Sequence, residues 1–149
     1  MAYYNKSELC RISILEFSKQ IERDQLIDLG QMVENDCHFV FYDADMFRQG
    51  VCQLFAYVLH RKFGYKVYII KAEKGFHIFC KTLDGQYVDV RGMTHSFSEF
   101  IGGLELPDIK DDTSEPYSFC DNDFDGDYHN VALVFANELI EHDIQRYKT

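Results

Sequence analysis

A cysteine, a histidine and an aspartate occur in this chain in an order that suits nucleophilic catalysis. Cys52 stands at the expected first turn of an apolar helix, and His77 and Asp89 lie in two short segments of strand-like composition. In cysteine enzymes the thiol is the nucleophile, an imidazole accepts its proton as the base, and a carboxylate orients the imidazole. The sequence therefore predicts a triad of Cys52, His77 and Asp89.

The loop between the two segments decides whether His77 and Asp89 meet, because successive side chains of a strand point to opposite faces. A three-residue loop at 83–85, with Gly85 in the left-handed conformation, pairs Thr82 with Gln86 and places His77 diagonally across from Asp89 on one face. A two-residue loop would turn them apart. The longer loop is favoured because it gathers four apolar side chains on the opposite face: Ile78, Cys80, Val88 and Val90.

Elements of regular structure must position these side chains. The patterns predict one or two helices within 7–32, a helix over 51–63 ended by Gly64, a strand over 65–71 and a hairpin over 76–91. They also predict a short helix over 97–101 with Ser96 as its N-cap, a long polar loop over 104–127 and a helix over 128–147. Residues 37–42 are an extended segment or short strand, followed by a turn at 43–45. We expect a single α+β domain over 1–149, with helices on one side of a small antiparallel sheet and the Cys52 helix central.

The stretch from about 49 to 102 resembles the transglutaminase-like branch of the papain-like cysteine peptidase superfamily, and small bacterial and bacteriophage proteins look most similar. The residues that carry this resemblance are Gly50, Cys52, Ala56, Gly64, His77, Asp84, Gly85, Tyr87, Asp89 and Gly92. The resemblance implies a papain-like core with the nucleophile at a helix N-terminus and the catalytic roles already given to the triad.

An acyl-transfer site also needs donors for the oxyanion. The helix N-terminus favours a thiolate, and the backbone N–H of Cys52 supplies one donor. Gly50 would let the preceding loop approach the substrate closely. The resemblance implies a glutamine for the second donor, but Met46 and Val51 stand at the two family positions. Gln49 is the nearest candidate by reach, and Asn35 and Tyr42 are others.

These features predict a cysteine-dependent enzyme acting on amide bonds of a protein or peptide, as a protease, a glutamine deamidase or a transglutaminase. Tyr87 and Arg91, on the same predicted face as Asp89, are candidate substrate-binding residues, although flanking a sheet edge is an equal interpretation. The alternative function is a non-catalytic acidic protein-binding module or inhibitor on the same scaffold. Taken singly, a cysteine, a histidine or an aspartate is more often structural, and only their joint order and register favour the triad.

The composition narrows the classes of partner. A net charge of -10, from 25 acidic and 15 basic residues, disfavours nucleic-acid binding, which requires clustered Lys and Arg. No apolar run is long enough to cross a membrane and no signal peptide is apparent, so we expect a cytoplasmic protein, although signal-independent secretion leaves no such mark. The five cysteines show no CxxC pair, which argues against a disulfide framework. The sequence does not indicate an oligomeric state.

No resident cofactor is expected, because the six histidines show neither HxxxH nor HExxH spacing. One weak calcium motif is present at Asp121, Asp123 and Asp125, whose spacing matches the opening of an EF-hand loop. The glutamate required at the twelfth position is replaced by Ala132. A solvated acidic turn before the last helix is therefore favoured over a calcium site.

Overall fold

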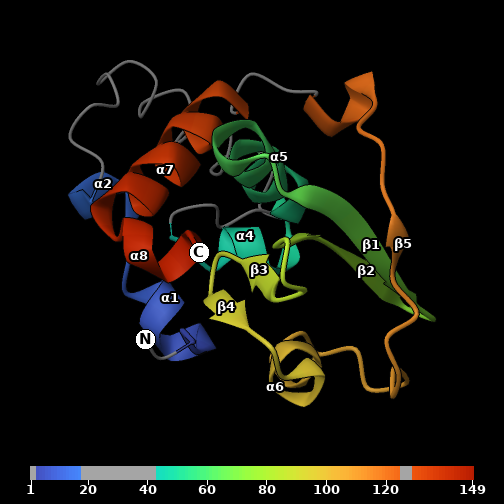
Figure 1. The fold of residues 1–149 in the computed structure, drawn as a ribbon. Coiled ribbons are helices and arrows are strands. Elements are labelled where there is room, and N and C mark those ends of the chain that lie inside the picture. Colours follow the sequence, from blue (N-terminus) through green and yellow to red (C-terminus); the bar gives the residue numbers. More distant parts are fainter. Residues whose placement is uncertain (1–2, 18–42, 125–128) are drawn as a thin grey trace.

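A five-stranded antiparallel sheet forms the centre of the structure, a computed structural model that describes residues 3–17, 43–124 and 129–149. The strands lie in the order β4-β3-β2-β1-β5. Their bounds are β1 Lys66–Ala72, β2 Gly75–Lys81, β3 Tyr87–Asp89, β4 Gly92–Thr94 and β5 Glu115–Pro116. Helices cover this sheet (Figure 1), which confirms the expected α+β class with a small antiparallel sheet.

The helix α5 (Cys52–Phe63) is central to the larger of two apolar cores. It packs on β2 and against α7 (His129–His142), and Gly64 ends it at φ 71°, in the left-handed region that favours glycine. Side chains from both helices and one sheet face fill this core, among them Leu54, Phe55, Phe135 and Ile140. The predicted central helix is therefore confirmed, and it begins at the proposed nucleophile.

The opposite face of the sheet is also covered, which corrects the expectation of helices on one side only. The helix α6 (Phe97–Gly102) lies there, and its Phe100 packs with Phe79, Tyr87 and Ile70 in a second apolar core. Figure 1 shows α6 on the other side of the sheet from α5 and α7. Both faces of the sheet are apolar, because β1 and β2 each place large side chains on both faces.

The register of the β2–β3 hairpin is the one predicted. Cys80 pairs with Val88 and Lys81 with Tyr87, while Thr82 N–H donates to the Gln86 carbonyl at 3.0 Å. Gly85 has φ 83° at the third loop position. The four apolar side chains of the predicted core face lie in the larger core.

Several short elements differ from the sequence-based expectations. The N-terminal region contains α1 (Lys6–Cys10) and α2 (Ile14–Phe17), and a short α4 (Met46–Gln49) precedes α5. The expected last helix is divided into α7 and α8 (Ile144–Tyr147), with Asp143 between them outside both helices. Ser96 caps α6 as expected, since its hydroxyl accepts from the Glu99 N–H.

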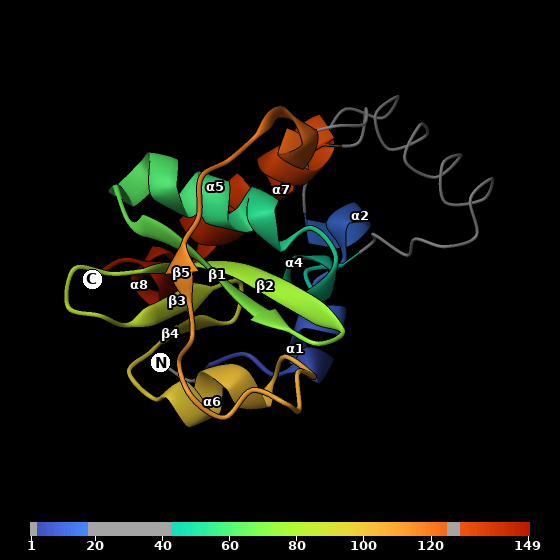
Figure 2. The ribbon, with the colours of Figure 1, turned by 90° about the vertical axis from the view of Figure 1, so that its right-hand side faces the viewer.

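The polar segment after α6 is not a loop throughout. It contains β5, which pairs with β1 at the sheet edge, and a 3-10 helix, η1 (Asp121–Phe124). Figure 2 shows this segment running from α6 past the outer edge of β1 toward the side of α5. Part of this segment is thus fixed to the sheet, and its end at 125–127 lies outside the described residues. The predicted strand at 37–42 lies wholly outside them. None of the helices in the described ranges has the length and apolar character needed to cross a membrane.

Candidate active site

Cys52 is the first residue of α5, where N–H groups of a helix have no partner within the helix. Val51 precedes it with non-helical backbone angles and provides no side-chain cap within the described part of the chain. The Sγ atom of Cys52 accepts a hydrogen bond from the Ile78 backbone N–H at 3.3 Å. The sulfur therefore lies at a helix N-terminus and beside a backbone donor of β2.

The Ile78 N–H is available because the sheet opens between β2 and β3. All seven residues of β2 pair with β1, but only Cys80 and Lys81 pair with β3. On the N-terminal side of Cys80, the edge of β2 faces the start of α5. The Cys52 thiol there accepts from a backbone N–H that a neighbouring strand would otherwise bind. The nucleophile is therefore fixed to the strand that carries His77.

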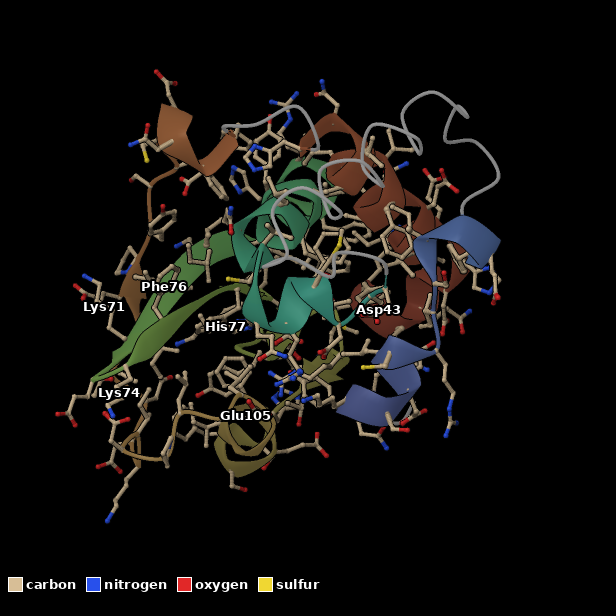
Figure 3. All side chains as sticks on the ribbon, turned by 180° about the vertical axis from the view of Figure 1, so that it is seen from behind. Asp43, Lys71, Lys74, Phe76, His77 and Glu105 are labelled. Atoms are coloured by element: carbon tan, nitrogen blue, oxygen red, sulfur yellow. The ribbon has the colours of Figure 1, made fainter. Side chains whose placement is uncertain are left out.

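His77 connects the thiol to the carboxylate. Its Nε2 lies 2.9 Å from Oδ2 of Asp89, and its buried Nδ1 has no hydrogen-bond partner among the described residues. The imidazole stacks on Phe79 with 6.0 Å between ring centroids and an interplanar angle of 8°. Figure 3 shows His77 toward the middle of the molecule, while Phe76 lies further along the hairpin. With Nε2 engaged, Nδ1 is the nitrogen available to exchange a proton with the thiol.

Burial alone would lower the pKa of His77, because desolvation disfavours the charged ring. The hydrogen bond to Asp89 and the interaction with the Cys52 side chain outweigh burial, and the pKa of His77 is raised above its ordinary value. The imidazolium is thus stabilised by the two groups between which a triad would place it. The predicted juxtaposition of these three side chains is present in the structure.

Asp89 is ionised and has more partners than the triad requires. Burial would raise the pKa of its carboxyl, but the charge of Arg91 and the contact with His77 hold that pKa well below its usual range. The Arg91 side chain donates to both carboxylate oxygens, with Nη2 at 2.6 Å from Oδ2 and Nε at 3.1 Å from Oδ1. The Arg91 backbone N–H and the Tyr3 hydroxyl also donate to Oδ1, at 2.9 and 3.2 Å.

The site is closed to solvent in this structure. Cys52, His77 and Asp89 are 5%, 1% and 3% exposed. The three side chains therefore offer little solvent-exposed surface. Burial does remove water from the site, which strengthens the electrostatic interactions within it.

The other predicted site residues lie in different surroundings. Gln49 is exposed at the end of α4, and its amide nitrogen donates to Asp45 at 3.1 Å. Gly50 follows α4, is exposed and has φ -126°, which any residue adopts. Tyr87 packs in the second core, where its hydroxyl donates to Asp112 at 2.8 Å. Neither Gln49 nor Tyr87 is aimed at the thiol by these bonds.

Arg91 is almost completely buried, at 2% exposure, and its Nη1 donates to the Phe100 carbonyl at 2.8 Å. It belongs to the site as a partner of Asp89. The sequence-based strand extended to residue 91, whereas β3 ends at Asp89 and Arg91 lies in the turn before β4. The Tyr3 contact, which spans 86 residues of sequence, had no signal in the sequence.

In the described part of the acidic motif, the Asp123 carboxylate binds groups of the protein itself. Both oxygens of Asp123 accept from the Tyr117 hydroxyl at 2.8 Å, and one also accepts from the Cys120 N–H at 2.9 Å. Asp121 is exposed at the start of η1, and Asp125 lies outside the described residues. Asp123 thus stabilises the turn through these hydrogen bonds.

No protein-family model, no curated protein and no solved structure matches this chain. A functional assignment therefore depends on the geometry of the site and on the sequence resemblance.

Proposed function

We propose that this protein is a cysteine-dependent acyl-transfer enzyme that acts on amide bonds of a protein or peptide. The observation that carries the proposal is the position of the His77 imidazole, which contacts the Asp89 carboxylate through Nε2 at 2.9 Å and interacts with the Cys52 side chain. A thiol at a helix start, an oriented imidazole and an ionised carboxylate are the parts that thioester chemistry requires. On this proposal the sheet and α5 form a papain-like core of the transglutaminase-like type.

The reaction would use the three side chains in order. The Cys52 thiolate attacks the amide carbonyl carbon, and the backbone N–H of Cys52 stabilises the oxyanion. Collapse of this intermediate breaks the carbon–nitrogen bond, and the imidazolium of His77 gives its proton to the departing amine or ammonia. The thioester is then attacked by water, which yields a carboxylic acid, or by an amine, which yields a new amide. His77 accepts the proton of that second nucleophile and the thiolate is released.

The second nucleophile and the leaving group distinguish three reactions. Hydrolysis of a main-chain amide is proteolysis, hydrolysis of a glutamine side chain is deamidation, and attack by an amine on the glutaminyl thioester is transamidation. All three share the first half of the cycle. Mass spectrometry of lysate proteins incubated with wild type or with Cys52→Ser separates them, as a cleavage, a gain of about one dalton or a crosslink.

A second candidate is a non-catalytic acidic binding module, which the burial of all three side chains favours. In this case His77, Asp89 and Arg91 are a structural ion cluster beneath α5, and Cys52 is a buried core residue. Buried, hydrogen-bonded charges of this kind occur without catalysis. The chemistry of the thiol distinguishes the two candidates.

Alkylation by iodoacetamide provides that test, with Cys10 and Cys120 as internal comparators. Both comparators are exposed, whereas Cys52 is buried, so access alone predicts the slowest labelling at Cys52. The enzyme hypothesis predicts that Cys52 is labelled at least as fast as the exposed thiols near pH 6, where ordinary thiols are mostly protonated. His77→Ala should lower the Cys52 rate by about tenfold or more and leave the other two rates unchanged. Slow labelling of Cys52 that is insensitive to His77→Ala would favour the binding module.

A further inference from the structure

Asp89 divides its negative charge among several donors. Its Oδ2 is 2.9 Å from His77 Nε2 and only 2.6 Å from Arg91 Nη2, so the guanidinium and the imidazole compete for one oxygen. Its Oδ1 accepts from Arg91 Nε, from the Arg91 backbone N–H and from the Tyr3 hydroxyl. An aspartate that served His77 alone would need none of these further donors.

The guanidinium is enclosed at this position. Its Nη1 donates to the Phe100 carbonyl, and a Cβ atom added to Gly103 would lie only 2.6 Å from Nη1. The Tyr3 ring packs against the same group, with Arg91 Cζ 4.6 Å from the ring centroid. Arg91 is thus held between β3, α6 and the N-terminal segment.

The charge balance around the imidazole follows from these contacts. A full carboxylate charge beside His77 would favour the imidazolium strongly, whereas a carboxylate already neutralised by a guanidinium favours it less. The hydrogen bond from Tyr3 withdraws further charge from the second oxygen. Burial and the nearby Asp89 raise the pKa of Tyr3, so its hydroxyl keeps its proton and remains a donor.

We propose that Arg91 and Tyr3 are positioning residues that set how much negative charge Asp89 presents to His77. Among the described residues, Asp89 from β3 and Cys52 from α5 act on the imidazole directly. Arg91 and Tyr3 contact Asp89, and Glu99 of α6 acts on both of them. By reducing the charge of Asp89, Arg91 and Tyr3 keep the imidazolium able to release its proton. This inference rests on the proposed function for its catalytic meaning, but its electrostatic content is independent of turnover.

An NMR titration of the His77 imidazole tests the proposal without any substrate. We expect Arg91→Met to increase the proton-binding constant of His77 about tenfold or more, because Asp89 then has one cation instead of two. Tyr3→Phe, which keeps the ring over Arg91 and removes only the hydroxyl, should produce a smaller increase. Arg91→Lys, which restores a positive charge, should return the constant toward the wild-type value.

Tyr4→Phe is the matched control, since the Tyr4 ring faces Arg146 at 3.5 Å and lies next to Tyr3 in sequence. It should leave the titration of His77 unchanged. A folded Arg91→Met variant in which His77 binds its proton as in wild type, or more weakly, would overturn the proposal. If Arg91→Met does not fold, Tyr3→Phe decides, and an unchanged titration in that variant overturns it. A shifted titration combined with unreactive Cys52 would leave the charge sharing intact and reject the enzyme.

Discussion

Asp89 has a role in the proposed chemistry, through His77, and in the stability of the fold, through Arg91. Asp89→Asn keeps the shape of the side chain but removes the charge opposite the buried guanidinium of Arg91. Breaking one partner of a buried ion pair costs about 3–5 kcal/mol, so we expect a decrease of that size in the free energy of unfolding. Urea denaturation at pH 7 measures it. Asp111→Asn, at an exposed position, is the matched control and should change stability by less than about 0.5 kcal/mol.

The difference in unfolding free energy between wild type and Asp89→Asn should depend on pH. The folded pKa of Asp89 lies below the ordinary value of 3.8, so its contribution to stability is present above that value and is lost as the pH falls through the folded pKa. The gap in unfolding free energy between wild type and Asp89→Asn should therefore narrow below about pH 4. An unchanged gap in acid would contradict the assignment of an ionised, paired carboxylate.

The partners of the triad were predictable to different degrees. His77 and Asp89 could be paired from sequence because a hairpin register and strand alternation are local rules. Arg91 shared their predicted face, but sequence alone did not show that its charge would be used internally. Tyr3 could not be found, because contacts between an N-terminal segment and a distant strand follow from tertiary packing.

At the scale of elements, the left-handed turn at Gly85 fixes the register that brings His77 and Asp89 together. An added Cβ at Gly85 meets no other atom within 4 Å, so Gly85→Ala tests backbone conformation alone. At φ 83° we expect a loss of about 1–2 kcal/mol in unfolding free energy. Gly102→Ala is the matched control, since it is equally free of neighbours and has no positive φ, and it should be neutral or slightly stabilising. Equal effects of the two changes in thermal or urea unfolding would contradict this role of Gly85.

The elements that sequence predicted well were long and periodic, such as α5, β1 and β2, while the three-residue β3 was found through its hairpin with β2. The short β4 and β5 were missed because two or three residues show no periodicity, and their pairing is set by the rest of the sheet. The second apolar core was missed because Tyr87 was interpreted as a substrate-binding candidate, whereas Phe100 of α6 packs on it. A strand that is apolar on both sides indicates two covering layers.

At the scale of the whole molecule, a net charge of -10 should influence which reagents and substrates reach the site. A cationic methanethiosulfonate should modify Cys52 faster than an anionic one of similar size, by about tenfold or more at low salt. The ratio should approach one at about 1 M NaCl, where charges are screened beyond about 3 Å. The exposed Cys120 provides the comparison within the same chain. A ratio that is insensitive to salt would show that global charge does not guide reagents to Cys52.

The hydrogen bond from the Ile78 amide to the Cys52 sulfur has a consequence for how folding can be followed. The Ile78 N–H lies beside the Cys52 sulfur only when the strands of the hairpin have paired and α5 has packed on them. An unfolded chain therefore lacks this donor, and the Cys52 thiol gains it only in the packed arrangement of α5 and the hairpin. Solvent access to the buried thiol should accordingly report whether helix and hairpin have come together.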